Sequence, residues 1–150
     1  MAPAWRSLRL AAEAARVESV DDEYHALFIG VGRGELMPYG SWYLSGFLME
    51  RPLAVLRGAL RSLGIERQSG VGEPEDHATA LCETMSMIIE SADEIGFATQ
   101  QAFFNEHMAP WMGQFFLDMQ TAESACFYRE VGQFGEQFIK LEQHYFSMMA

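Results

Sequence analysis

Apolar residues recur at steps of three and four along nearly the whole chain, which is the spacing of one face of an α-helix. The sequence has no sustained alternation of apolar and polar residues, which would mark a half-buried strand. It also lacks the Asn-Gly and Asp-Gly pairs that are typical of tight hairpins. With 150 residues, 49% of them hydrophobic, the chain is long enough for one core and short for two. We therefore expect an all-α fold, a single-domain bundle of six to seven helices over residues 1–150.

Proline, glycine and capping residues divide this pattern into helices. The helices are expected at 5–17, after a cap at Asp21 or Asp22, from Pro52 to a stop at Gly64, from Pro74 to about Ala92, at 97–107, at 110–122, and from about Ser124 to Met148. The segment GVGRGELMPYGSWY, residues 30–43, holds four glycines and a proline and is expected to form a loop.

Apolar stripes on these helices are predicted to form the core. They comprise Leu53, Leu56, Leu60 and Leu63; His77, Leu81, Met85 and Ile88; and Phe127, Val131, Phe134, Phe138, Leu141 and Tyr145. The phenylalanines of the last third are expected to be core residues rather than a ligand box, because they fall at helical spacing. Cys82 and Cys126 form no CxxC pair and are expected to be reduced, buried thiols.

Charge is unevenly distributed along the chain, whose net charge is −11. Residues 68–128 hold ten acidic residues and no Lys or Arg. This argues against nucleic acid as a partner, because neutralising phosphates needs clustered basic residues. It permits a cationic partner, although a solvated acidic surface explains the same pattern.

Localisation signals are also informative. No apolar run has the length of a membrane span, and charged residues interrupt the N-terminal segment where a secretory signal would be apolar. A cytoplasmic protein is the expectation.

Enzyme chemistry has little support in the motifs. A zinc hydrolase would need His-Glu-x-x-His, and Glu106-His107 has no second histidine at that spacing. The GVGRG segment is followed by Glu35 where a dinucleotide fingerprint needs glycine, and the one lysine of the chain is Lys140. We therefore predict no catalytic residues, no metal site and no cofactor.

The segment EPEDH, residues 73–77, is the densest cluster of polar side chains. Pro74 suits the first turn of a helix, so Glu73, Glu75 and Asp76 are expected beside the helix N-terminus, where the helix dipole stabilises carboxylates. Helix capping alone could explain these acids. A histidine and a carboxylate at this place also suit a surface that binds a peptide.

Beyond its chemistry, EPEDH followed by Leu81 and Met85 resembles the E-P-x-D-H-x-x-x-x-L-x-x-M signature of the TorD/DmsD family. The segment PYGSWYLSGFLMERPLAVLRGALRSLGI resembles the family's Pro-aromatic-Gly/Glu-Ser-x-Tyr loop and the helix after it, and EYHALFIG matches the segment before that loop. The two motifs lie in the family's order, about 30 residues apart, and the resemblance covers residues 20–148.

The resemblance implies an all-helical cytoplasmic chaperone, not an enzyme. Such chaperones bind the twin-arginine signal peptide, or another region, of an apo-molybdoenzyme catalytic subunit and hold it for insertion of the molybdenum cofactor before export. Formate dehydrogenases, dimethyl sulfoxide and trimethylamine N-oxide reductases and related enzymes are all open as clients, and the sequence does not choose among them. By position, the implied recognition surface consists of Pro38, Tyr39, Gly40, Ser41, Tyr43, Glu73, Pro74, Asp76 and His77.

Family members usually have additional N-terminal helices, whereas about 22 residues precede EYHALF here. The resemblance therefore implies a shortened member, a fragment, or a chain that buries an exposed face by homodimerising or by exchanging helices. Two other functions remain open at this point. One is a GTP-binding variant of the chaperone, and the other is a helical metal-binding protein that uses His77, Glu73 and another histidine.

Overall fold

Helices form the regular structure of the chain in the computed structural model, which describes residues 1–68, 70–91 and 95–148. Eight α-helices and two π-helical segments lie in these ranges, and their one β-type pairing is an isolated bridge. The predicted all-α class is confirmed. The helices form two compact units, which we call the terminal unit (Met1–Met37 with Met112–Ala150) and the central unit (Pro38–Trp111). A single domain over 1–150 stays a prediction.

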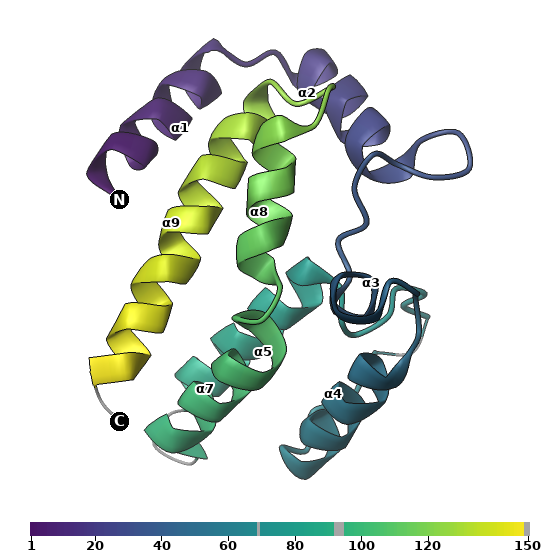
Figure 1. Ribbon diagram of the computed structural model, residues 1–150, viewed down its shortest axis with the longest axis vertical. Coiled ribbons are helices and arrows are strands. Elements are labelled where there is room, and N and C mark those ends of the chain that lie inside the picture. Colours follow the sequence, from purple (N-terminus) through teal and green to yellow (C-terminus); the bar gives the residue numbers. More distant parts are fainter. Residues whose placement is uncertain (69, 92–94, 149–150) are drawn as a thin grey trace. The chain divides into compact units, whose positions relative to one another are not determined.

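The terminal unit is built around a long C-terminal helix. Its elements are α1 (Ala2–Ala14), α2 (Val17–Tyr24), the π-helical segment η1 (His25–Ile29), α8 (Met112–Thr121) and α9 (Phe127–Met148). Helices α8 and α9 lie side by side, and α1 packs along α9 (Figure 1). The cap predicted at Asp21 or Asp22 was wrong, because α2 begins at Val17 after Arg16 and includes both aspartates.

Two glycines let α8 and α9 approach closely. A Cβ atom at Gly135 would lie 2.4 Å from the Phe116 ring, and one at Gly132 would lie 2.8 Å from the Phe116 carbonyl oxygen. Both contacts are closer than real Cβ atoms allow. The buried face of α9 therefore runs through Gly132, Gly135, Ile139 and Phe146.

This face differs from the predicted one. Phe138, Leu141 and Tyr145 are exposed, so the expectation that they belong to the core was wrong. The periodicity located the helix correctly. The prediction assigned the large apolar side chains to the buried face, whereas α8 covers the neighbouring face that holds the two glycines. Both cysteines are also exposed rather than buried, which corrects that expectation too.

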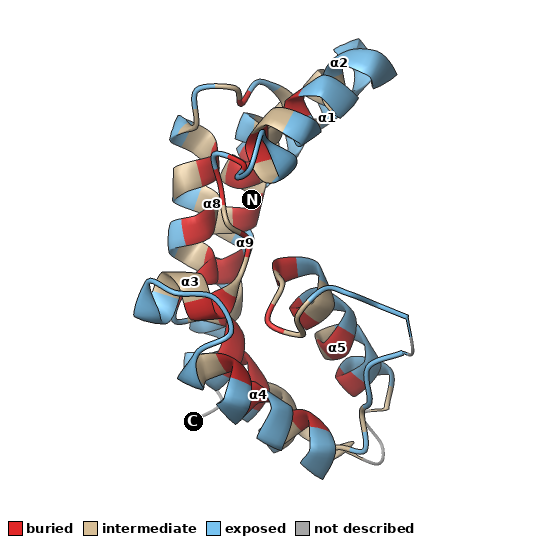
Figure 2. Ribbon diagram, turned by 90° about the vertical axis from the view of Figure 1, so that its right-hand side faces the viewer, coloured by how far each residue is buried: buried red, intermediate tan, exposed pale blue. Residues whose placement is uncertain are grey.

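The central unit consists of α3 (Gly40–Ser45), α4 (Arg51–Ser62), α5 (Ala78–Glu90), α7 (Phe97–Phe103) and the π-helical segment η2 (Phe104–Met108). On α4 the predicted face is confirmed, since Leu53, Leu56 and Leu60 are buried. On α5, Leu81 and Ile88 are buried as expected. Figure 2 marks these buried turns in red.

Part of the predicted loop 30–43 is helical. The segment GVGRG does form a tight loop, in which a Cβ at Gly34 would lie 2.5 Å from the Leu27 carbonyl oxygen. Residues Gly40–Ser45, however, form the short helix α3, which ends at Gly46 in the left-handed conformation with φ of 81°. Across the residues that the structure describes, none of the helices combines the length and apolar character needed to cross a membrane.

Candidate functional site

The two sequence motifs meet backbone to backbone. Tyr39 and His77 form the isolated antiparallel bridge of the central unit. Two hydrogen bonds hold it, from the Ala78 N–H to the Pro38 carbonyl at 2.8 Å and from the Gly40 N–H to the Asp76 carbonyl at 2.9 Å. Residues that lie 35 or more positions apart in the sequence thus share one surface, and the structure brings both halves of the predicted set together.

Asp76 is the buried acid of this surface, with 3% of its area exposed. Its Oδ2 accepts a hydrogen bond of 2.7 Å from the backbone N–H of Ser41, in the first turn of α3. Its Oδ1 is buried and has no hydrogen-bond partner among the described residues. A buried polar atom left without a partner costs about 1–3 kcal/mol, so this oxygen is a strong candidate for contact with a bound donor.

His77 is the N-cap of α5, and this corrects the predicted start of the helix. Helix α5 starts at Ala78 rather than at Pro74, and its first turn contains no acid. His77 is extended, with φ of −64° and ψ of 139°, because its backbone pairs with Tyr39. Its Nδ1 accepts from the Thr79 N–H at 3.1 Å, so the neutral ring carries its proton on Nε2.

Side chains hold Glu73 and Glu75, and a backbone N–H of α3 holds Asp76, so none of these acids lies in the first turn of α5. Glu73 accepts from the Tyr39 hydroxyl at 2.5 Å. Glu75 accepts from Arg57 of α4 at 2.8 and 3.0 Å. Burial opposes the ionisation of Glu75, but its hydrogen bonds and the Arg57 charge outweigh burial, so the pKa of Glu75 is lowered.

Aromatic rings cover one side of the same surface. The Tyr39 ring lies edge-on to His77, with ring centroids 5.1 Å apart, and the Tyr43 ring lies 5.5 Å from Trp111. A Cβ at Gly40 would lie 3.1 Å from the Trp111 Nε1. A side chain at position 40 would therefore press on the indole, which would have to shift by a few tenths of an ångström.

The predicted site residues differ in burial: some are buried and can only position other groups, and others are accessible to a bound molecule. Ser41 is 0% exposed, so it positions other groups: its Oγ accepts from the Met49 N–H at 3.2 Å. Pro38 is buried, and its carbonyl oxygen takes part in the bridge. Tyr39, Tyr43, Pro74 and His77 are half-buried and Glu73 is exposed, so these side chains can reach a bound molecule.

A cavity of about 350 Å³ lies beside Asp76 within the central unit. It is lined by Gly40, Leu44, Ser45, Arg51, Pro52, Val55, Leu56, Asp76, Leu81, Glu106, His107 and Trp111. The sequence motifs predicted Gly40 and Asp76 but missed the contributions of η2 and of Trp111. No local pattern signals them, because Trp111 reaches the site only through its packing on a glycine 71 positions earlier.

Within residues 1–68, 70–91 and 95–148, no three His, Cys, Asp or Glu side chains gather as a metal ion would require. Glu73 accepts a hydrogen bond from the Tyr39 hydroxyl, and His77 accepts one from the Thr79 N–H.

Comparison with known proteins adds a family match. The family described as nitrate reductase delta subunit matches residues 1–117. A protein named chaperone protein TorD from Vibrio parahaemolyticus is 26% identical over 133 residues, which is 82% of this chain and 62% of that protein. A TorD chaperone from Vibrio cholerae is 24% identical over 127 residues, which is 79% of this chain and 58% of that protein.

A second kind of relative carries a different name. The "Probable Tat proofreading chaperone DmsD" of Haemophilus influenzae is 26% identical over 114 residues, covering 75% of this chain and 54% of that protein. The chain thus spans between half and two thirds of the length of these relatives. The predicted resemblance to the TorD/DmsD family is confirmed.

Proposed function

Because the chain belongs to the nitrate reductase delta subunit family, we propose that it is a cytoplasmic chaperone for an apo-molybdoenzyme. It binds the twin-arginine signal peptide of the catalytic subunit, or a nearby region, and holds the client for cofactor insertion before export. The names of the relatives, chaperone protein TorD and Tat proofreading chaperone DmsD, support a binding protein rather than an enzyme.

One observation carries this proposal. The two motif segments are joined by a backbone bridge, so Tyr39, Glu73, Asp76 and His77 lie on one surface beside a cavity. A paired surface with a buried acid, an exposed acid and aromatic rings provides what a basic and partly apolar peptide needs.

Binding of synthetic twin-arginine signal peptides to the purified chain tests the proposal at the level of residues. Glu73→Gln keeps an acceptor for the Tyr39 hydroxyl but removes one exposed charge from the surface. We expect it to weaken peptide binding about two- to fivefold, the effect of a solvent-exposed ion pair. Glu90→Gln, at the far end of α5, makes the same charge change and should leave affinity unchanged.

Equal affinity of the wild type, Glu73→Gln and Glu90→Gln would remove Glu73 from the site. Titration with GTP in the same instrument separates the proposed chaperone from its nucleotide-binding variant. A GTP affinity tighter than the peptide affinity would favour that variant.

A further inference from the structure

The cavity beside Asp76 has walls of two kinds. Apolar side chains from α3, α4 and α5 line one part of it: Leu44, Val55, Leu56 and Leu81. Charged or aromatic groups line another part: Arg51, Asp76, Glu106, His107 and Trp111. Its volume of about 350 Å³ is at the small end of the ligand-pocket range, so it suits one side chain rather than a folded segment.

The balance of charge in this cavity favours a cation. Asp76 and Glu106 contribute two negative charges, and Arg51 contributes one positive charge. His107 is 7% exposed, and burial lowers its pKa although the Glu106 carboxylate opposes the change. His107 is therefore neutral at neutral pH, which leaves the lining with one net negative charge.

The acceptors match a planar, multi-donor cation. Asp76 offers the buried Oδ1 that has no hydrogen-bond partner among the described residues. Glu106 offers a carboxylate whose Oε2 lies 3.9 Å from the His107 Nε2, and its side chain is 60% exposed. A guanidinium carries five N–H donors at the end of three methylenes, so apolar walls and aromatic rings suit its stem and its flat face.

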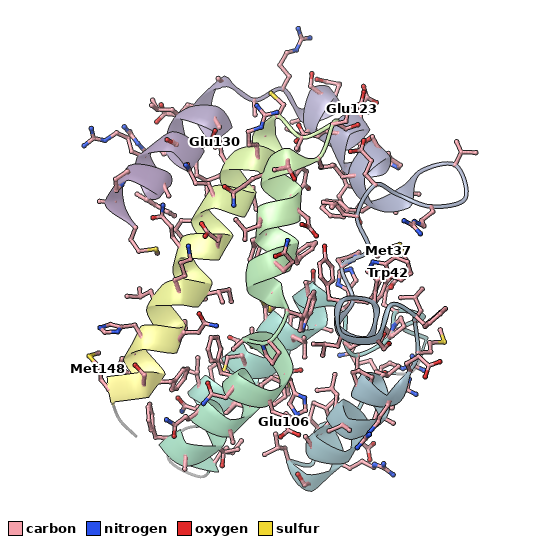
Figure 3. The ribbon with its side chains drawn as sticks, viewed as in Figure 1. Met37, Trp42, Glu106, Glu123, Glu130 and Met148 are labelled. Carbon is pink, nitrogen blue, oxygen red and sulfur yellow. The ribbon has the colours of Figure 1, made fainter. Side chains whose placement is uncertain are left out.

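The π-helical geometry of η2 places these groups at the cavity. In η2 the Ala109 N–H bonds to the Phe104 carbonyl, five residues earlier, instead of four. Glu106 and His107 line the cavity together with residues of α4, and Figure 3 shows Glu106 on the side of η2 toward α4. The His107 carbonyl accepts from the Trp111 indole at 2.8 Å, which fixes the ring beside Gly40. Single π turns in helices are often found at functional sites.

We propose that this cavity is the subsite for one arginine side chain of the client peptide, with Asp76 and Glu106 as its acceptors and Trp111 as its aromatic wall. The inference rests on the proposed function and assigns specificity to η2 and Trp111, which lie outside both sequence motifs. The exposed acid Glu73 then contacts another part of the peptide.

The Trp111 indole N–H gives a direct readout by NMR. The chain has three tryptophans, so a nitrogen-labelled sample gives three indole signals, and Trp111→Phe identifies the one at the cavity. We expect this signal to shift with a twin-arginine peptide and with N-acetyl-argininamide at millimolar concentration. The matched Arg→Gln peptide and N-acetyl-glutaminamide should leave it in place. Trp5, in the terminal unit, is the internal control.

A double-mutant cycle assigns the acceptor. Glu106→Gln should weaken binding of the arginine peptide about two- to fivefold, because Glu106 is partly exposed and its ion pair is screened. It should not change the affinity of the Arg→Gln peptide. Glu90→Gln is the matched control, with the same charge change on α5 outside the cavity lining.

The outcomes separate this inference from the proposed function. A bound twin-arginine peptide that moves neither the Trp111 signal nor the Glu106→Gln affinity overturns the subsite and leaves the chaperone proposal standing. A Trp111 shift with argininamide, without binding of any signal peptide, supports the guanidinium subsite and contradicts the chaperone proposal. No response to either probe overturns both.

Discussion

Glu23 holds the start of α9, although 103 positions separate it from Cys126. Its carboxylate accepts backbone N–H bonds from Cys126, Phe127 and Tyr128 at 2.7–3.0 Å. The first amides of a helix have no partner within the helix, so a carboxylate here satisfies several at once and complements the helix dipole. Glu35 binds the backbone and hydroxyl of Ser124 just before them. The contacts of Glu23 give the first residue of EYHALF a structural role.

Replacing Glu23 by alanine should therefore lower the free energy of unfolding by about 1–3 kcal/mol, the range for a lost cap and unsatisfied buried donors. Urea unfolding followed by circular dichroism measures the change. Glu66→Ala, at an exposed loop position, is the control and should change stability by less than about 0.5 kcal/mol. Equal effects of the two substitutions would show that Glu23 does not cap α9.

Two histidines predict how stability depends on pH. Burial is the main cause that lowers the pKa of both His77 and His107, and neighbouring acids oppose it. The unfolded chain has an ordinary histidine pKa of about 6.5 and so binds protons at a higher pH than the folded chain. The contribution of these two histidines to the free energy of unfolding is therefore fully present above this pKa and is lost as the pH falls below it.

Urea unfolding at pH 7.5 and pH 5.5 should accordingly show a less stable wild type at the lower pH. His107→Gln should reduce that difference, because it removes one of the two titrating groups. His144→Gln, at an exposed position on α9, is the matched control and should retain it. If the stability difference between pH 7.5 and pH 5.5 were as large in His107→Gln as in the wild type, His107 would not be one of the titrating groups.

The sequence identified the residues of EPEDH but not their partners. Their acidity suggested a helix N-terminus, whereas Arg57, Tyr39 and Ser41 hold them. All three partners belong to other segments of the chain, and the helix propensity of residues 73–77 cannot predict contacts with distant segments. The backbone pairing of His77 delays the helix start by four residues beyond the expected proline.

At the scale of elements, α8 and α9 illustrate what periodicity can predict. A repeat of three and four positions located α9 to within three residues of its start, and its end was correct. The buried face was misassigned because Gly132 and Gly135 contribute almost no hydrophobicity of their own. They are buried because α8 approaches them closely, which only the packing reveals.

Alanine at Gly132 should lower stability by about 1–3 kcal/mol, because the nearest atom to the new methyl group is a backbone oxygen that cannot move alone. Gly58→Ala is the matched control. Gly58 lies within α4 with open space around it, so alanine there should be neutral or stabilise by up to about 1 kcal/mol. Thermal unfolding of the two variants measures the contrast, and a destabilised Gly58→Ala with an unaffected Gly132→Ala would refute the packing account.

The short helix α3 was not predicted, because it too depends on a contact with a distant segment. Helix α3 spans six residues and begins within PYGSWY, where glycine and proline indicate a loop. Its first turn is stabilised by the Asp76 carboxylate from a distant segment. The helices of residues 97–122 were predicted more accurately, because Pro110 marks their division within the chain.

At the scale of the whole molecule, charge and exposed apolar surface indicate its partners. Residues 68–128 lack Lys and Arg, and the acids of the candidate site lie among them. Raising salt from 50 to 500 mM should therefore weaken peptide binding, because solvent-exposed charges are screened within about 10 Å at 0.1 M salt. Affinity that is independent of salt in an anisotropy titration would exclude an ion-pair mechanism.

The exposed side chains of α9 offer a surface for a proposed self-association. Phe138, Leu141 and Tyr145 recur at helical spacing and are 40–46% exposed. An apolar stripe of this kind marks an interaction surface, and we propose a second copy of the chain as its partner. Light scattering should show a concentration-dependent dimer that Leu141→Lys disrupts. A monomer at every concentration would contradict this.

The most direct test of the chaperone account is the binding of a panel of labelled twin-arginine signal peptides, by fluorescence anisotropy, with Arg-Arg to Lys-Lys controls. The account predicts micromolar or tighter binding to at least one peptide and at least a tenfold loss in its Lys-Lys control, because lysine cannot reproduce the planar donor pattern of a guanidinium. Equal affinity for the arginine and lysine forms, or no binding across the panel, would contradict it.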